Sequence, residues 1–208
     1  MFKDRTQAAE QLARRLQHYK GQSPLILAIP RGAAPMGVVL AQQLAGQWDV
    51  VLVHKLCAPH QPELAIGAVD ESGQMWLAPH AASVGATQDW IQAEKDRQLR
   101  VLQQRRRLYS PLHTPIPVRD RVVIVVDDGL ATGATMQAAL TAVRRGQPAR
   151  LVCAVPVASS EALARIMPLA DETVCLLKPA FFQAVGEFYE QFPQVSDEEV
   201  ARYLSAGK

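Results

Sequence analysis

Short apolar runs recur along this chain, and they predict buried strands. Each run is predominantly hydrophobic over four or five residues, and together they occupy residues 25–29, 50–53, 122–126, 151–155 and 173–177. Continuous runs of this length are typical of strands that are covered on both faces, as in a parallel sheet.

Between these runs, apolar residues recur at the spacing of amphipathic helices. In the first such segment Ala9, Leu12, Ala13 and Leu16 share one face, and Gly21 follows as a stop signal. Further helices are predicted over residues 35–44, 87–108 and 135–145, in a short segment from 159, and in a terminal segment that starts with the capping box at 196–199.

Residues 54–77 depart from this alternation. Residues 56–62 contain two prolines and little pattern, which predicts a loop. Residues 64–69 and 74–77 flank an Asp-Glu-Ser-Gly turn and predict a β-hairpin.

Buried strands that alternate with helices predict an α/β fold with a mainly parallel sheet. In such sheets, ligands bind beyond the carboxyl ends of the strands. Three predicted strand ends carry polar or charged residues: Pro30-Arg31-Gly32, His54-Lys55 and the segment 127–135. We therefore expect the functional site at this edge.

Composition narrows the class of protein. The 208 residues are 49% hydrophobic with a net charge of +2, which fits one ordinary domain and does not by itself favour nucleic acid as a partner. Three cysteines without a C-x-x-C pair suggest neither a zinc site nor a disulfide framework. We find no signal peptide and no apolar run near the ~20 residues of a membrane span, so we expect a cytoplasmic protein without membrane partners.

The segment 129–135 has the chemistry of a phosphate-binding turn. Gly133 permits backbone angles that other residues avoid, and the small side chains let a ligand approach the main chain. The first amides of the following helix lack internal partners and suit an anion, and two threonine hydroxyls add donors. The predicted phosphate-binding residues are Ala131, Thr132, Gly133, Ala134 and Thr135.

Two carboxylates, Asp127 and Asp128, stand directly before this turn. They would repel a phosphate, but they can accept charge-assisted hydrogen bonds from a ribose diol, so a sugar phosphate satisfies both halves of the segment. Other phosphate motifs do not fit. Gly133 is followed by Ala134 instead of the lysine of a Walker A loop, and the glycines are not spaced as in a dinucleotide fingerprint. Phosphatases that attack through aspartate use an acid-x-acid pattern, whereas Asp127 and Asp128 are adjacent.

Residues 122–135 resemble the signature that binds 5-phosphoribosyl 1-diphosphate (PRPP) in type I phosphoribosyltransferases, at every defining position. The resemblance implies a Rossmann-like, mainly parallel sheet flanked by helices, with a β-hairpin or flexible loop and a small C-terminal hood. It divides the chain into a core at 1–177, including the loop and hairpin 55–77, and a hood at 178–208. Residues 30–32, 62–69 and the aromatic tail further resemble a subgroup of uncharacterised phosphoribosyltransferases.

The resemblance also implies roles. Asp127 and Asp128 would hold the ribose and lie near the reacting carbon, and Arg31 and Lys55 would complete the catalytic set. The diphosphate would be bound by Arg31, Gly32 and Lys55. Alternatively, the loop that holds Arg31 and Gly32 is a plain tight turn and Lys55 is a solvated surface lysine. Mg²⁺ would bind to the oxygens of PRPP. The protein would offer it no separate metal site, and its contacts with the protein would be to Asp127 and Asp128.

The family's diphosphate loop usually holds a cis peptide, which the resemblance places at Pro30–Arg31. In the hood, Phe181, Phe182 and Tyr189 would stack on the acceptor base, or alternatively would pack a small subdomain.

The predicted function is transfer of the phosphoribosyl group of PRPP to a small nitrogenous acceptor by a homodimer. A PRPP sensor without turnover is the alternative, with RNA as a partner of an arginine-rich helix that carries Arg100, Arg105, Arg106 and Arg107. A solvated helix face is the ordinary explanation of those arginines. A third interpretation is a hydrolase or synthase that acts on other sugar phosphates. The sequence does not identify the acceptor.

Overall fold

A five-stranded parallel sheet forms the centre of the computed structural model, which describes residues 1–109 and 115–206 except the side chains of residues 62 and 63. The strand order is β2-β1-β6-β7-β8, which confirms the predicted α/β class. The strands are β1 (Leu25–Ala28), β2 (Gln47–Val50), β6 (Val122–Val126), β7 (Arg150–Val157) and β8 (Glu172–Leu177).

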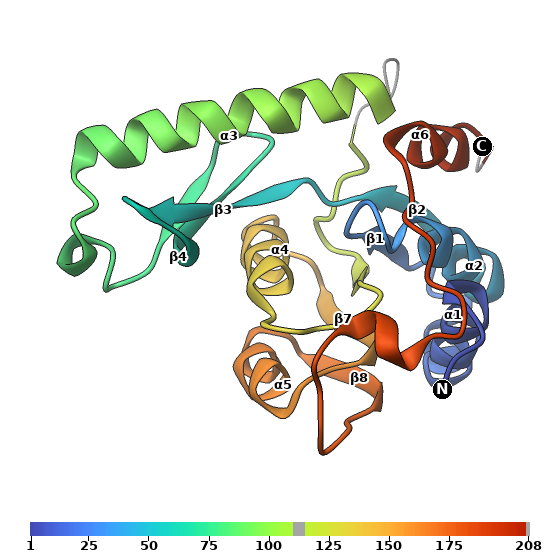
Figure 1. Ribbon diagram of the computed structural model, residues 1–208. Coiled ribbons are helices and arrows are strands. Elements are labelled where there is room, and N and C mark those ends of the chain that lie inside the picture. Colours follow the sequence, from blue (N-terminus) through green and yellow to red (C-terminus); the bar gives the residue numbers. More distant parts are fainter. Residues whose placement is uncertain (110–114, 207–208) are drawn as a thin grey trace.

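Helices cover both faces of this sheet (Figure 1). One face packs against α1 (Arg5–Arg15) and α2 (Ala34–Leu44), and the other against α4 (Ala134–Arg145) and α5 (Ser160–Ile166). Alternate residues of each strand enter the two cores: Ile124 and Val126 face α1 and α2, whereas Val123 and Val125 face α4. This double coverage explains why the strands read as continuous apolar runs.

A second, antiparallel sheet stands apart from the first. It consists of β3 (Val53–Ala58), β4 (Gln61–Asp70) and β5 (Met75–Leu77), and the long helix α3 (Gln88–Tyr109) packs on it (Figure 1). The hairpin predicted over 64–77 is confirmed as β4 and β5.

Two predictions in this region were wrong. The loop predicted over 56–62 is mostly strand, because β3 pairs with β4 across a turn at residues 59–60. The apolar run 50–53 is not one strand: β2 ends at Val50 and β3 begins at Val53 in the other sheet. Lys55 therefore lies on β3 and not at the end of a strand of the parallel sheet.

The C-terminal part crosses back to the N-terminus. A short 3₁₀ helix η4 (Val185–Phe188) precedes α6 (Asp197–Ala206), and the amide of Phe2 donates to the Phe188 carbonyl at 2.8 Å. The division into a core and a hood stays a prediction, and residues 207–208 of that hood lie outside the described residues. The other 3₁₀ helices are η1 (Gln17–Tyr19), η2 (Ala82–Val84) and η3 (Met167–Leu169).

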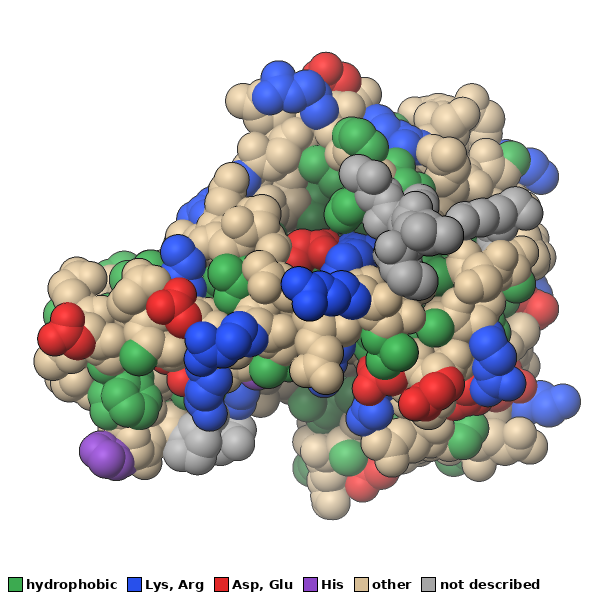
Figure 2. Space-filling view, turned by 90° about the horizontal axis from the view of Figure 1, so that it is seen from above, with side chains coloured by type: hydrophobic (Ala, Val, Ile, Leu, Met, Phe, Trp, Pro, Cys, Tyr) green, Lys and Arg blue, Asp and Glu red, His purple; other side chains and the backbone are tan. Residues whose placement is uncertain are grey.

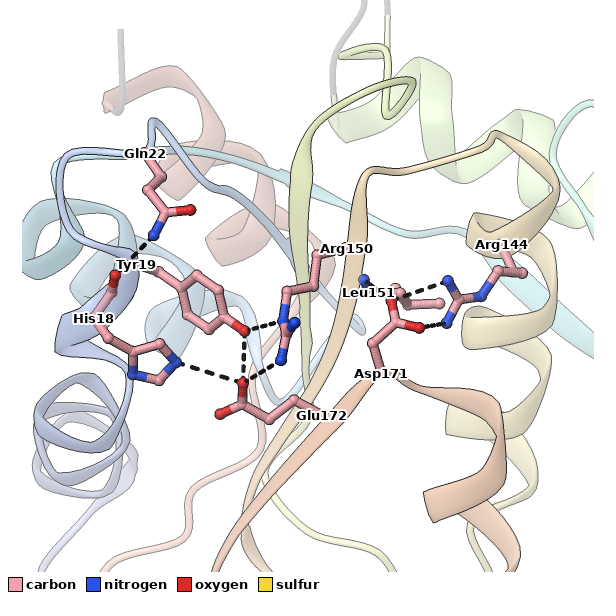
Figure 3. A network of polar contacts seen from close by, with 8 residues as sticks. All are labelled: His18, Tyr19, Gln22, Arg144, Arg150, Leu151, Asp171 and Glu172. Carbon is pink, nitrogen blue, oxygen red and sulfur yellow. Dashed lines mark hydrogen bonds and ion pairs between the residues drawn. The ribbon is translucent and has the colours of Figure 1, made fainter.

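Polar contacts secure the edge of the parallel sheet where β7 and β8 begin (Figure 3). The carboxylate of Glu172 accepts hydrogen bonds from the Tyr19 hydroxyl at 2.6 Å and from Arg150 at 3.2 Å. This network lies at the edge opposite the strand ends considered below. No helix in the described part of the chain is both long and apolar enough to cross a bilayer.

Candidate ligand site at the carboxyl edge of the sheet

The candidate site forms where neighbouring strands β1 and β6 end. Ala28 pairs with Val126 at the last position of both strands, so the loops that follow leave the same edge of the sheet. The peptide bond between Pro30 and Arg31 is cis, as the family resemblance implied. The loop then packs on the acidic pair: a Cβ atom on Gly32 would stand 2.1 Å from Asp128 Oδ2.

The turn after the acids encloses a pocket of about 190 Å³. Gly133, which directly precedes the first residue of α4, has a φ of +75°. This left-handed conformation favours glycine. Val185 of η4 lines one side, and the remaining lining residues are Asp127, Gly129, Leu130, Ala131, Thr132, Gly133, Ala134, Thr135 and Met136. The structure thus brings all the predicted phosphate-binding residues to one pocket.

The backbone of this turn is held through its carbonyl groups. Ser159 Oγ donates to the Ala131 carbonyl at 2.8 Å, and Arg165 Nη1 donates to the Thr132 carbonyl at 3.0 Å. Within the described residues, the amides of Ala131, Thr132 and Gly133 have no protein acceptor. Unpaired amides before a helix N-terminus are the donors that an anion requires.

The two acids have different surroundings. Asp128 Oδ2 accepts a hydrogen bond from Arg5 Nε at 2.9 Å, whereas Asp127 Oδ1 accepts only the amide of Asp128 at 2.9 Å among the described residues. Burial, followed by repulsion from Asp128, holds the pKa of Asp127 well above its usual range. Burial also raises the pKa of Asp128, although Arg5 works against it. An acidic pair of this kind favours a ligand that donates hydrogen bonds.

Arg5 belongs to this site, and sequence reasoning missed it. Its side chain is 9% exposed, its Nη1 donates to the Pro193 carbonyl at 2.7 Å, and its guanidinium lies 3.7 Å from the centroid of the Phe192 ring. In the sequence, Arg5 is simply a polar residue in the first turn of an amphipathic helix. Only the return of the C-terminal segment encloses it.

The predicted diphosphate-binding residues are only partly brought together. Arg31 and Gly32 lie in the loop beside Asp128, and Arg31 Nη1 stands 3.8 Å from Asp197 Oδ2 of α6. Lys55 lines a different pocket of about 430 Å³, between β3 and α3, with Trp90. The expectation that Lys55 follows a strand of the parallel sheet was wrong because the chain changes sheets after Val50.

The three aromatic residues predicted for the base hood have different environments. Phe181 is 90% exposed. Phe182 stacks on Phe188 with ring centroids 5.3 Å apart, and Tyr189 is buried with its hydroxyl donating to the Asp128 carbonyl at 2.6 Å. The subdomain-packing interpretation therefore describes Phe182 and Tyr189, and of the three it is Phe181 that presents its ring to solvent.

Within the described residues, no group of three or more His, Cys, Asp or Glu side chains is arranged to hold a metal ion. The two acids beside the phosphate-binding turn are the groups that could contact a cation carried by a phosphorylated ligand.

A parallel sheet with an acidic pair and an amide-lined turn at its carboxyl edge is the arrangement of type I phosphoribosyltransferases. The chain belongs to the phosphoribosyl transferase domain family, whose model matches residues 2–191.

Among relatives, the chain is 40% identical over 206 residues to “Putative phosphoribosyl transferase Rv0571c” of Mycobacterium tuberculosis (strain ATCC 25618 / H37Rv). That match covers 98% of this chain and 46% of the relative, so the chain spans about half the length of that relative. The chain is also 42% identical to TT1426 from Thermus thermophilus, whose crystal structure superposes with a TM-score of 0.91 over 99% of this chain and 98% of that one.

Proposed function

We propose that this protein transfers the 5-phosphoribosyl group of PRPP to a nitrogen of a small acceptor and releases diphosphate. The observation that carries the proposal is the turn at Ala131, Thr132 and Gly133, whose amides have no acceptor in the described part of the protein and which directly follows two acids. In this reaction the bond from ribose C1 to the diphosphate oxygen breaks and a bond from C1 to nitrogen forms. The acceptor nitrogen loses its proton.

The proposed role of the acidic pair is electrostatic. Positive charge develops on the ribose ring as diphosphate leaves, and a carboxylate held beside the ring stabilises that charge. Asp127 and Asp128 would accept the ribose hydroxyls, and the turn 131–135 would fix the 5′-phosphate. Holding both ends of the sugar orients C1 toward the acceptor, which lowers the entropic part of the barrier.

The departing diphosphate requires positive charge at the other side of the ribose. Arg31 and Gly32 lie in the loop beside Asp128 and are the proposed diphosphate-binding residues, with Mg²⁺ carried on the PRPP oxygens. Lys55 would join them only through movement of the β3–β4 hairpin, as lids do in other enzymes. Phe181 is the candidate for stacking on the acceptor.

The test is release of diphosphate from PRPP and Mg²⁺ in the presence of a panel of purine, pyrimidine and other nitrogenous acceptors. Replacing both Asp127 and Asp128 by Asn should reduce PRPP affinity or turnover by more than about tenfold, because charge-assisted hydrogen bonds are lost. Unchanged kinetics in that variant would remove the acids from the mechanism. A homodimer is expected, and light scattering coupled to size exclusion would test it.

A PRPP sensor without turnover is the second candidate. Its distinguishing result is tight PRPP binding without diphosphate release for any acceptor. The RNA-binding form of this candidate has little support: Figure 2 looks down on the side that carries α3 and shows Lys and Arg side chains interspersed with Asp and Glu, and Arg106 is committed to ion pairs. Binding of ribose 5-phosphate but not PRPP would instead favour the hydrolase or synthase interpretation.

A further inference from the structure

Arg5 connects three parts of the chain that are distant in sequence. It stands at the start of α1, its Nε donates to Asp128 after β6, and its Nη1 donates to Pro193 near the C-terminus. The guanidinium also stacks on the Phe192 ring at 3.7 Å. Two directional hydrogen bonds and a ring contact fix the guanidinium plane more firmly than a single surface ion pair would.

The segment that Arg5 holds is the hood segment, defined here as residues 188–193. Backbone pairing joins it to the N-terminus, since Glu190 N donates to the Phe2 carbonyl at 2.9 Å and Gln191 N donates to the Lys3 carbonyl at 3.0 Å. From the other side, the Tyr189 hydroxyl donates to the Asp128 carbonyl at 2.6 Å. Asp128 is thus bound to this segment through its side chain and through its backbone.

We propose that Arg5 is a positioning residue of the ribose site, which holds the Asp128 carboxylate and the hood segment in one fixed arrangement. The ribose-binding role of Asp128 in this inference rests on the proposed function. The link from Asp128 through Arg5 to the hood segment does not depend on it. Arg5 pairs with Asp128 and not with Asp127. Among the described residues, Asp127 has no cation partner. A ligand that contacts Asp128 is thereby coupled to the hood segment.

The first experiment needs no ligand. Hydrogen exchange of the hood segment is compared for wild type, Arg5→Gln, Arg5→Lys, Asp128→Asn and the double variant Arg5→Gln/Asp128→Asn. Arg5→Gln should speed exchange at Glu190 and Gln191 by more than about tenfold, and Arg5→Lys by less, because lysine keeps the charge but loses the second directed donor.

In the double variant, exchange should be no faster than in Arg5→Gln alone, because the Asp128 side chain reaches the hood segment through Arg5, whereas the bond from Tyr189 to the Asp128 carbonyl is kept in every variant. Exchange at the hood segment that is unchanged in Arg5→Gln would overturn the proposal. Fully additive effects of the two substitutions would also overturn it, since they would make Arg5 and Asp128 independent. Arg150→Gln is the control, because Arg150 forms its ion pair with Glu172 at the opposite edge of the sheet.

The second experiment separates positioning from general damage. Calorimetry with Mg²⁺ measures binding of PRPP, ribose 5-phosphate and inorganic phosphate. Arg5→Gln should weaken the two ribose ligands by about tenfold or more while inorganic phosphate, whose proposed site is the turn 131–135 with no contact to Asp128, keeps its affinity. An equal loss for all three ligands would indicate a distorted site and contradict the positioning role. Failure of wild type to bind PRPP would reject the proposed function, and the exchange experiment would still decide the role of Arg5.

Discussion

Gly32 and Asp128 are in direct contact, and no larger residue fits between them. A Cβ atom at position 32 would stand 2.1 Å from Oδ2 of Asp128 and 3.0 Å from its Cγ, well inside van der Waals contact. The same oxygen accepts the hydrogen bond from Arg5, so the carboxylate has little freedom to retreat. Glycine at position 32 therefore sets the position of the second acid.

Replacing Gly32 by Ala should displace the Asp128 carboxylate and lengthen its bond to Arg5. We expect PRPP affinity to fall by about tenfold or more, since a displaced acid loses its charge-assisted hydrogen bonds to the ligand. Calorimetric titration with PRPP and Mg²⁺ measures the change. Gly85→Ala is a control for general destabilisation, because Gly85 has a φ of +81° that a side chain strains, although no atom would meet its Cβ and the residue lies outside the site. Equal PRPP affinities in the two variants would contradict the steric argument.

The sequence could predict those features that are local in the chain. The acids, the turn and the start of α4 form one continuous segment, so their composition alone indicated a phosphate site. Arg5 and Asp128 are 123 positions apart, so no local sequence pattern predicts their ion pair. Lys55 was misplaced for a related reason: an uninterrupted apolar run gives no sign that residues 50 and 53 belong to different sheets.

The interpretation of the arginines on α3 as a solvated face was wrong for Arg106. Its guanidinium donates to Glu71 in a bidentate pair at 2.6 Å and to Asp49 at 3.0 Å. Asp49 is only 1% exposed, so Arg106 supplies the charge that a buried carboxylate requires. These partners come from the hairpin and from β2, and helical periodicity carries no information about them.

Arg106→Gln should therefore destabilise the protein strongly. Removing one partner of a buried ion pair leaves an uncompensated charge and costs about 3–5 kcal/mol of unfolding free energy. Arg107→Gln, one position further along the same helix and exposed, should stay within about 0.5 kcal/mol of wild type. Urea unfolding of both variants measures the difference. Equal stabilities would mean that the Arg106 network contributes nothing net.

Glu172 should make the fold sensitive to acid. Burial works to raise the pKa of Glu172, but hydrogen bonds from Tyr19, Arg150 and His18 outweigh it and lower the pKa overall (Figure 3). A depressed pKa in the folded state contributes stability above the unfolded value of about 4.3, and this contribution is lost as pH falls through the folded pKa. Glu172→Gln should thus destabilise the protein at pH 7, and the difference should shrink below about pH 4.

Urea unfolding at several pH values tests this prediction, with Glu161→Gln on the exposed face of α5 as the control. A difference between wild type and Glu172→Gln that does not change with pH would indicate lost packing in place of lost charge.

Asp127 should show the opposite behaviour, because the site places it where a carboxylate is unfavourable. Burial and the neighbouring Asp128 raise the pKa of Asp127, while Arg5 opposes this only in part. When the folded pKa is higher than the unfolded one, the folded state binds more protons, so stability falls as pH rises from about 4 through the folded pKa. At neutral pH the Asp127 carboxyl group therefore destabilises the ligand-free folded state relative to the unfolded state.

Asp127→Asn removes this ionisable group and should raise the melting temperature at pH 7, measured without PRPP or Mg²⁺, while the gain should vanish below about pH 4. The same substitution should weaken PRPP binding by about tenfold or more, because an amide accepts the ribose hydroxyls less strongly than a carboxylate. A gain in stability combined with a loss of binding is characteristic of a residue kept for function at the expense of the fold. A variant that is less stable at neutral pH would instead indicate that Asp127 is a structural residue whose carboxylate the fold requires.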